Sequence, residues 1–372
     1  MDLTQTVEAE RRATLMAPVQ LGELALRNRV VMAPMTRSRA LPDGCAHASA
    51  ATYYAQRATA GMIITEGVCI CAEGVGNPNV PGIWSRDQIE SWRPVTDAVH
   101  ELGGTIVLQL WHTGRASDPS LQPGGRQQVA PSAVGIRGKT YTSRGWVEFS
   151  PPRALERSEI RAIVETYAAA AVNARKAGFD GVEIHGANGY LIDQFLHAGS
   201  NHRTDGYGGS PQRRARFMHE VVGAVVDACG AGRVGLRISP SSSFYGMEDP
   251  EPEAIYEAAL GGLPVGLAYV HVVEPGISGS TTVVRAADAL DSGWVRARWS
   301  GGLIGAGDYT APSAVEALAS GRVDAVAFGR LFVANPDLPR RLVEATELNV
   351  PRRETFYGGG DEGYLDYPAL SG

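Results

Sequence analysis

Long apolar runs and basic runs are both missing from this chain of 372 residues. No apolar stretch reaches the ~18 residues that a membrane-spanning helix needs, so we expect no membrane partner. The segment Met1 to Arg12 is polar and lacks the basic and apolar regions of a secretory signal. The net charge of -6 argues against nucleic-acid binding. These absences favour a small-molecule partner. We expect a monomer or a homodimer.

Cysteine and lysine are also scarce. The cysteines have no paired framework, which predicts reduced thiols and a cytoplasmic location; they are Cys45, Cys69, Cys71 and Cys229. Cys69 and Cys71 alone are too sparse for a metal site. The chain has only two lysines, Lys139 in a long loop and Lys176 in a helical segment. A Schiff-base enzyme, which needs a lysine at a strand end, is therefore a poor fit.

Eight apolar, β-branched segments alternate with helical patterns along the chain. The expected strands are residues 29–34, 61–66, 104–111, 181–185, 233–239, 269–273, 301–305 and 324–329. The expected helices are residues 85–102, 158–177, 212–229, 251–260, 311–320 and 336–346. Eight such units over roughly 250 residues or more predict an α/β fold, an eight-stranded parallel (β/α)8 barrel of the TIM type. A doubly wound sheet is the alternative, but no Gly-x-Gly-x-x-Gly turn follows an early strand.

Two segments do not fit this repeat. Val19–Arg29 predicts a short hairpin around Gly22 that would close the N-terminal mouth of the barrel. Thr113–Leu155 is long and rich in Gly, Pro and Ser, and residues 140–149 within it alternate about a turn. Such a loop after the third strand would cap the C-terminal mouth, where barrel active sites lie. We expect residues 1–372 to form one domain, with residues 1–18 a loosely ordered extension.

Polar or aromatic side chains stand at the C-terminal ends of four expected strands. They are Thr36 after the first, Gln109 and Trp111 on the third, Glu183 and His185 on the fourth, and Arg237 and Ser239 on the fifth. Any one of them is as often a hydrogen-bonded core group as a functional one. Their shared position on four segments favours a site. Glu183 and His185 could be imagined as metal ligands, but no matching partner elsewhere supports a metal.

The turn after the fourth strand adds two further groups. Asn188 and Tyr190 follow His185, on a turn whose glycines permit unusual backbone geometry. Two hydrogen-bonding groups beside a potential proton donor favour carbonyl chemistry.

The last two units have the pattern of a phosphate cradle. Gly307 and Asp308 follow the seventh strand, and Gly329 and Arg330 follow the eighth. Barrels commonly bind phosphate at these loops, because free backbone N–H groups favour an anion. Thr310 and Asn335 are expected N-caps of the helices that follow. The glycines alone would fit tight turns as well, but Arg330 adds a donor suited to phosphate.

Seven blocks of this sequence resemble the Old Yellow Enzyme family of FMN-dependent ene-reductases, and the likeness covers Leu21 to Pro368. The blocks are NRVVMAPMTRSRA from Asn28, QLWHTGR from Gln109, GFDGVEIHGANGYLIDQFL from Gly178, SNHRTDGYGGS from Ser200, VGLRISP from Val234, AVAFGRLFVANPDLPRRL from Ala325 and FYGGGDEGYLDYP from Phe356. Each block is moderately specific, and their shared order makes coincidence a poor explanation. The resemblance implies FMN and NAD(P)H as cofactors.

The resemblance also implies roles for individual residues. Thr36 would bond flavin O4, Gln109 the pyrimidine edge, and Arg237 the region of N1 and O2, with Pro34 and Met35 alongside. The phosphate positions would be Gly307, Asp308, Gly329 and Arg330, with Asp308 acting through its backbone N–H. His185 and Asn188 would bind the substrate carbonyl, Tyr190 would donate the proton, and Trp111 and Tyr357 would form pocket walls. The implied reaction reduces the activated C=C bond of α,β-unsaturated carbonyl compounds, with hydride from flavin N5.

Some features depart from the family pattern, and other functions remain open. Asn77 and Asn79 stand where relatives usually carry aromatic residues, which predicts a wider, more polar pocket and a bulkier or oxygenated substrate. The segment 276–299 resembles relatives only weakly.

The same flavin site could instead oxidise or isomerise a biosynthetic intermediate. A flavin-free isomerase or lyase that binds a phosphorylated ligand is a further alternative, against which Thr36, Gln109 and Arg237 argue.

Overall fold

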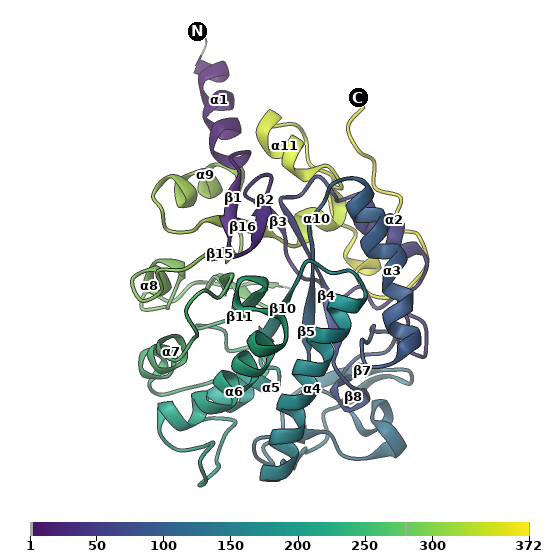
Figure 1. The fold of residues 1–372 in the computed structure, drawn as a ribbon, viewed down its shortest axis with the longest axis vertical. Coiled ribbons are helices and arrows are strands. Elements are labelled where there is room, and N and C mark those ends of the chain that lie inside the picture. Colours follow the sequence, from purple (N-terminus) through teal and green to yellow (C-terminus); the bar gives the residue numbers. More distant parts are fainter. Residues whose placement is uncertain (1–2, 280, 372) are drawn as a thin grey trace.

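A closed barrel of eight parallel strands forms the centre of the computed structural model, which describes residues 3–279 and 281–371 (Figure 1). The order around the barrel is β10-β11-β12-β15-β16-β3-β4-β5. The strands are β3 (Val30–Met32), β4 (Met62–Cys69), β5 (Ile106–Trp111), β10 (Gly181–Gly186), β11 (Val234–Ile238), β12 (Tyr269–Val273), β15 (Leu303–Ala306) and β16 (Ala325–Phe328). Each overlaps one of the eight expected strands, so the prediction of a (β/α)8 barrel is confirmed.

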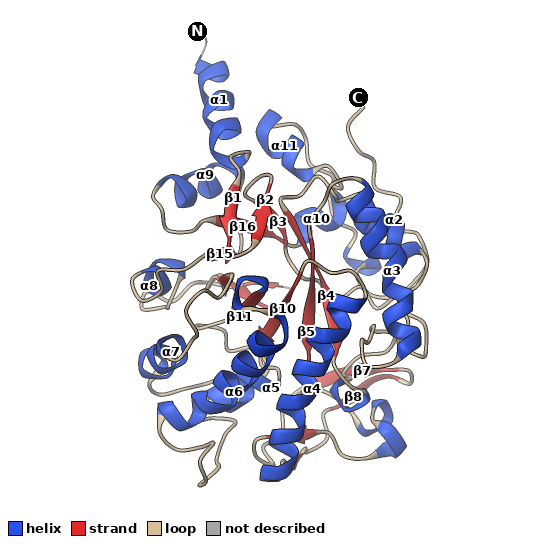
Figure 2. Ribbon diagram, in the orientation of Figure 1, coloured by secondary structure: helices blue, strands red, loops and turns tan. Residues whose placement is uncertain are grey.

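Helices surround the strands on the outside of the barrel (Figure 2). They are α1 (Leu3–Leu15), α2 (Ser49–Ala55), α3 (Arg86–Glu101), α4 (Arg157–Lys176), α5 (Leu191–Leu196), α6 (Pro211–Cys229), α7 (Pro252–Gly261), α8 (Ser292–Arg296), α9 (Ala311–Ala319), α10 (Arg330–Ala334) and α11 (Leu338–Glu344). Single 3-10 turns occupy Ala72–Gly74, Pro119–Leu121, Pro123–Gly125, Ala231–Arg233 and Arg353–Thr355. Capping boxes explain where α3 and α9 begin, since Ser85 and Thr310 accept hydrogen bonds from the third backbone N–H of each helix.

The helix expected over residues 336–346 differs from the structure. Asn335 ends α10 instead of beginning a helix, and α11 starts at Leu338. Pro336 explains the break, because proline has no N–H to continue the helical hydrogen bonds of α10. The Asn335 side chain donates to Leu331 O at 2.9 Å and accepts from Asn349 N at 2.8 Å, so it holds the junction together.

The N-terminal segment also differs from expectation. Residues 1–18 are expected to be loosely ordered; residues 1 and 2 lie outside the described part of the chain, and α1 spans Leu3–Leu15 and packs against α9 and α11. Leu15 is fully buried and anchors the helix in the core, which the polar composition of the segment concealed. No helix among the described residues has the length and apolar character that crossing a bilayer takes.

Two hairpins lie at opposite ends of the barrel (Figure 1). The predicted hairpin around Gly22 is present as β1 (Val19–Leu21) and β2 (Leu24–Leu26), and its leucines pack on lumen residues such as Met62 and Ile304. It closes the N-terminal mouth. The predicted hairpin in the long loop consists of β7 (Lys139–Thr142) and β8 (Gly145–Glu148). Two smaller pairs are β6 (Val129–Ala130) with β9 (Arg153–Ala154), and β13 (Ile277–Ser278) with β14 (Thr281–Thr282).

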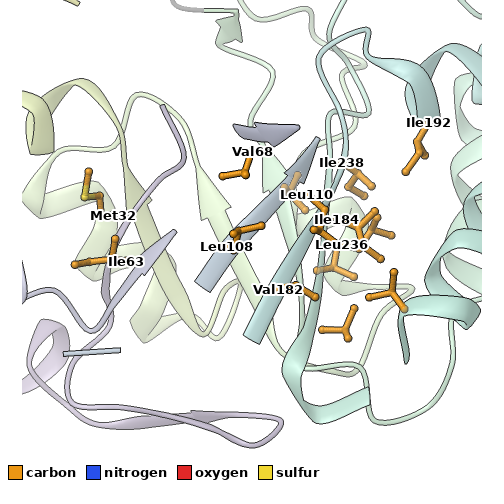
Figure 3. Packing of buried hydrophobic residues seen from close by; sticks show 14 of the residues in the cluster. Met32, Ile63, Val68, Leu108, Leu110, Val182, Ile184, Ile192, Leu236 and Ile238 are labelled. Carbon is orange, nitrogen blue, oxygen red and sulfur yellow. The ribbon is translucent and has the colours of Figure 1, made fainter. Parts of the chain in front are cut away.

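Strand alternation separates the core from the lumen. Figure 3 shows the apolar layer outside the barrel, to which β5, β10 and β11 contribute Leu108, Leu110, Val182, Ile184, Leu236 and Ile238. The residues between them have side chains on the other face of each strand. Those residues are Gln109, Glu183, His185 and Arg237, all buried. Packing of the apolar layer therefore fixes the register that directs polar groups into the lumen.

Candidate active site

A cavity of about 1490 Å³ lies at the C-terminal mouth of the barrel. A single small ligand commonly occupies a pocket of ~300–1,000 Å³, so this cavity has space for a cofactor and a substrate together. All of the site residues predicted from the sequence line it: Pro34, Met35, Thr36, Gln109, Trp111, His185, Asn188, Tyr190, Arg237, Gly307, Asp308, Gly329, Arg330 and Tyr357. A second, smaller cavity of about 710 Å³ is lined by residues between 204 and 220, and none of the predicted site residues line it.

A buried hydrogen-bond network surrounds Glu183 in the lumen. Its carboxylate accepts from Gln109 Nε2 at 2.8 Å and lies 2.8 Å from His271 Nδ1. Burial acts to raise the pKa of Glu183, but His271, Arg237 and Gln109 outweigh it and leave the pKa lowered, so the group is ionised. Burial lowers the pKa of His271, so a neutral imidazole donates its Nδ1–H to the carboxylate. The network fixes the side chain of Gln109.

His271 was missing from the predicted site. It lies on β12 two residues after Tyr269, and both side chains are buried. The alternation that placed Gln109 and Arg237 in the lumen would have found it, had it been applied to the strand predicted over residues 269–273.

Six residues that line the cavity have a buried polar atom with no hydrogen-bond partner within the described residues. Four of these atoms belong to predicted site residues, namely His185 Nδ1, Asn188 Oδ1, Arg237 Nε and Trp111 Nε1, and the other two are Arg11 Nε and Thr346 Oγ1. Folded proteins pair nearly all buried polar atoms, so atoms left unpaired beside a large cavity point to a ligand. An amide side chain can present either its oxygen or its nitrogen, and Asn188 can therefore act as acceptor or donor there.

Tyr190 stands at the centre of an aromatic cluster. It precedes α5 as its N-cap, and its ring meets those of Trp111 and His185 edge-on, at centroid distances of 5.0 and 4.9 Å. Burial, with Tyr245 and Tyr357, raises the pKa of the Tyr190 hydroxyl well above its ordinary value, so the phenol stays protonated. Burial also lowers the pKa of His185, which keeps the imidazole neutral. The site thus combines a protonated phenol with a neutral imidazole.

The predicted phosphate positions lie together at the ends of two neighbouring strands. β15 and β16 pair in parallel, and Gly307 and Asp308 follow the first while Gly329 and Arg330 follow the second. Arg330 Nη2 lies 3.1 Å from Asp308 Oδ1 and 2.9 Å from Thr282 Oγ1. A Cβ at Gly307 would lie 2.6 Å from Glu274 Cβ, so the chain needs glycine there. Thr282 belongs to the segment for which the sequence indicated no role.

The C-terminal segment forms one rim of the cavity, and no sequence motif indicates how it is attached. Arg37 donates to Phe356 O at 3.0 Å and to Gly363 O at 2.8 Å. Arg39 donates to Gly360 O at 3.0 Å and to Thr355 O at 3.1 Å. Tyr357, 58% exposed, is held at the rim by these bonds to its neighbours.

Glu66 fixes the segment that carries Arg37, to which the C-terminal rim is attached. Its carboxylate accepts from the backbone N–H of Arg37 at 3.0 Å, next to Thr36. It lies where the pairing of β4 with β5 shifts register, an irregularity of the kind that often occurs beside active sites. Burial raises the pKa of Glu66 to about 7, although Arg37 opposes the shift.

Known proteins share both this fold and this sequence. Residues 14–349 match the family described as the NADH:flavin oxidoreductase / NADH oxidase family. The chain is 40% identical over 369 residues to 12-oxophytodienoate reductase 2 of Arabidopsis thaliana, covering 98% of this chain and 97% of that protein. It superposes on the old yellow enzyme homologue from Zymomonas mobilis with a TM-score of 0.92 and 42% identity, over 96% of this chain and all of that one.

The chain belongs to the Old Yellow Enzyme family. It is an NAD(P)H-dependent flavin oxidoreductase whose cofactors are FMN and NAD(P)H. A further solved relative is morphinone reductase in complex with tetrahydroNAD, with a TM-score of 0.90 and 47% identity over 96% of this chain and 98% of that one.

The cavity of this Old Yellow Enzyme family member fits FMN in its chemistry. Unpaired buried polar atoms, among them Arg237 Nε, suit the polar edge of the isoalloxazine ring. Arg330 and the backbone beyond β15 and β16 suit its phosphate, since N–H groups past the end of a strand ladder are free to bind an anion.

Proposed function

We propose that this chain is an ene-reductase that uses NAD(P)H to reduce the activated C=C bond of α,β-unsaturated carbonyl compounds, with the whole chain acting as one FMN-binding barrel. The observation that carries the proposal is the grouping of His185, Asn188 and Tyr190. The first two have buried, unpaired polar atoms, and the third has a protonated hydroxyl beside them. Polarising a carbonyl and protonating a neighbouring carbon require such groups together.

In this proposal the cofactor is held from two sides. Thr36, Gln109 and Arg237 would bind the polar edge of the ring, and Pro34 and Met35 would lie alongside it. The phosphate lies at Gly307, Asp308, Gly329 and Arg330, where Asp308 contributes its backbone N–H. When bound there, FMN would supply the hydride chemistry, with NAD(P)H as the source of the hydride and N5 as the atom that would donate it to the substrate.

The remaining steps belong to the side chains. His185 and Asn188 donate hydrogen bonds to the substrate carbonyl oxygen and stabilise the negative charge that develops there. Tyr190 Oη transfers its proton to the α-carbon. Trp111 and Tyr357 enclose the substrate. The Glu183 network holds Gln109 in place, since both carboxylate oxygens are engaged by hydrogen bonds.

The pocket around the substrate supports a bulkier or oxygenated acceptor. Asn77 and Asn79 line the cavity, and so do Tyr141 and Trp146 on the β7–β8 hairpin. Both aromatic side chains are at least half exposed, and their rings meet edge-on at 5.5 Å. Amides and exposed rings at the cavity edge suit a substrate that extends beyond a single small ring. The names of two relatives, morphinone reductase and 12-oxophytodienoate reductase, agree with a reductase function.

The proposal is tested by product analysis in D2O. The purified enzyme is incubated anaerobically with NADPH and 2-cyclohexenone, and the product is examined by mass spectrometry. We expect cyclohexanone carrying one deuterium at the α-carbon, because the Tyr190 hydroxyl exchanges with solvent before it transfers its proton. NADPH consumption without a saturated ketone would refute the proposed reaction.

A further inference from the structure

The turn that carries Asn188 and Tyr190 has a backbone conformation that needs support. Asn188 and Gly189 have φ values of 57° and 74°, so two consecutive residues adopt the left-handed conformation. Asparagine tolerates this conformation poorly compared with glycine, and such residues persist where their surroundings hold them. A Cβ at Gly189 would lie 2.8 Å from Phe244 O, so the turn also packs tightly on a neighbouring loop.

Two consecutive side chains of α5 hold the Gly189 residue from both sides. Its backbone N–H donates to Asp193 Oδ2 at 2.8 Å. Its carbonyl oxygen accepts from Gln194 Nε2 at 2.7 Å. Asp193 and Gln194 are both fully buried. We infer that these two residues form a clasp on Gly189 that aligns Asn188 and Tyr190 for the reaction.

The carboxylate of Asp193 is itself fixed by several donors. Tyr256 Oη donates to its Oδ1 at 3.2 Å, and His197 Nε2 lies 3.2 Å from the same oxygen. Ser239 Oγ donates to Oδ2 at 3.4 Å and accepts from the backbone N–H of Asn188 at 2.8 Å. Asp193 therefore restrains Asn188 through Ser239 as well as Gly189 directly.

Gln194 joins the same turn to the loop after β5. Its Nε2 also donates to Thr113 O at 3.0 Å, and its Oε1 accepts from Arg115 N at 3.1 Å. A Cβ at Gly114 would lie 2.3 Å from Gln194 Oε1, so the amide is packed against the backbone there. The loop begins just after Trp111, whose ring contacts Tyr190. Gln194 thus fixes the position of the Trp111 side chain relative to that of Tyr190.

Asp193 and Gln194 are positioning residues in this account. The inference rests on the proposed function, because it assigns their effect to proton transfer by Tyr190. Misplacing a reacting group by about 1 Å can cost on the order of 100-fold in rate. A loosened clasp should therefore slow the reaction while the hydroxyl of Tyr190 remains present.

A double-mutant cycle tests the clasp. The variants are Asp193→Asn, Tyr190→Phe and the double variant, and the rate constant measured is that of reoxidation of the pre-reduced flavin by saturating 2-cyclohexenone. We expect Asp193→Asn to slow this step by roughly 10- to 100-fold in the wild-type background. In the Tyr190→Phe background the further loss should be clearly smaller, because the part that acts through Tyr190 is already gone and only the part that acts through Asn188 remains.

The possible outcomes separate the clasp from the proposed function. A Tyr190→Phe variant with the wild-type rate would refute the proton donor. A slow Tyr190→Phe variant beside an unaffected Asp193→Asn variant would overturn the clasp alone. An equal loss in both backgrounds would also overturn it, because a general structural defect is additive.

Two more variants serve as a control and a substitute in this test of the clasp. Asp249→Asn neutralises another buried carboxylate, which pairs with Arg214 at 2.9 Å and accepts from the backbone N–H of Ala198, just after α5, at 2.7 Å. It should keep the wild-type rate per bound flavin, and a matching loss there would overturn the clasp. If Asp193→Asn does not fold, Gln194→Glu replaces it in the cycle. That change removes the donor to Gly189 O, and the same slowing and the same non-additivity are expected.

Discussion

Replacing Tyr190 with phenylalanine removes one hydroxyl and leaves the surrounding packing in place. The ring would keep its edge-on contacts with Trp111 and His185. General acid catalysis contributes about 10²- to 10⁴-fold in rate, so we expect alkene reduction to slow by at least about 10²-fold. That factor corresponds to ~2.7 kcal/mol in the activation barrier, at 1.36 kcal/mol for each tenfold change.

Stopped-flow spectroscopy measures the two half-reactions separately. Flavin reduction by NADPH should stay intact in Tyr190→Phe, while reoxidation by 2-cyclohexenone slows. A matched control is Tyr167→Phe, since Tyr167 is fully buried in α4 and its hydroxyl has no hydrogen-bond partner in the described part of the chain. This control should react like the wild type. Equal reoxidation rates in wild type and Tyr190→Phe would remove Tyr190 from the mechanism.

The pH dependence of reoxidation gives a second measure of the same group. An acid works only while it is protonated, and burial raises the pKa of Tyr190 above the ordinary value near 10. The raised pKa extends the protonated range upward, so the wild-type rate should show no loss from Tyr190 ionisation below about pH 10. A loss centred near pH 8 that is absent in Tyr190→Phe would contradict this environment.

Three further predictions concern the cofactor, the rim and the pocket. Asp308→Asn removes a carboxylate beside Arg330 and should tighten FMN binding severalfold at low salt, because that negative charge repels the phosphate. Fluorescence titration of the apoprotein measures the dissociation constant. An unchanged value would show that this charge does not act on the phosphate. Arg39→Met removes donors to Gly360 O and Thr355 O, and should lower the free energy of unfolding by about 1–3 kcal/mol in denaturant titrations. Unaltered stability would argue against the attachment of the rim. Asn77→Phe should narrow the pocket and shift kcat/KM toward 2-cyclohexenone relative to a polycyclic enone, and a shift in the opposite direction would contradict the proposed substrate class.

Much of the barrel could be predicted because its strands are short and apolar and alternate with helices, two of which begin at clear capping boxes. The same alternation that buries Val182 and Ile184 places Glu183 and His185 in the lumen, so strand ends could be examined for chemistry before the fold was known. The grouping of the proposed phosphate residues was predictable for a related reason. Consecutive parallel strands end side by side, which brings Gly307 and Arg330 to one place.

The features that could not be predicted from the sequence depend on contacts between distant residues or on local exceptions. The bonds from Arg37 to the C-terminal rim join residues more than 300 positions apart, and nothing near Arg37 indicates them. α1 has few apolar residues, and its order depends on packing against α9 and α11. The break between α10 and α11 was misjudged because Pro336 suits the first turn of a helix as well as the end of one.

A visible absorption spectrum through one catalytic cycle tests the central claim most directly. The purified protein is reduced anaerobically with NADPH and then mixed with 2-cyclohexenone. We predict flavin bands that bleach with NADPH and return with the enone as cyclohexanone forms. Flavin that stays bleached with the enone, and regains its colour only when oxygen is admitted, would contradict the assignment of an ene-reductase.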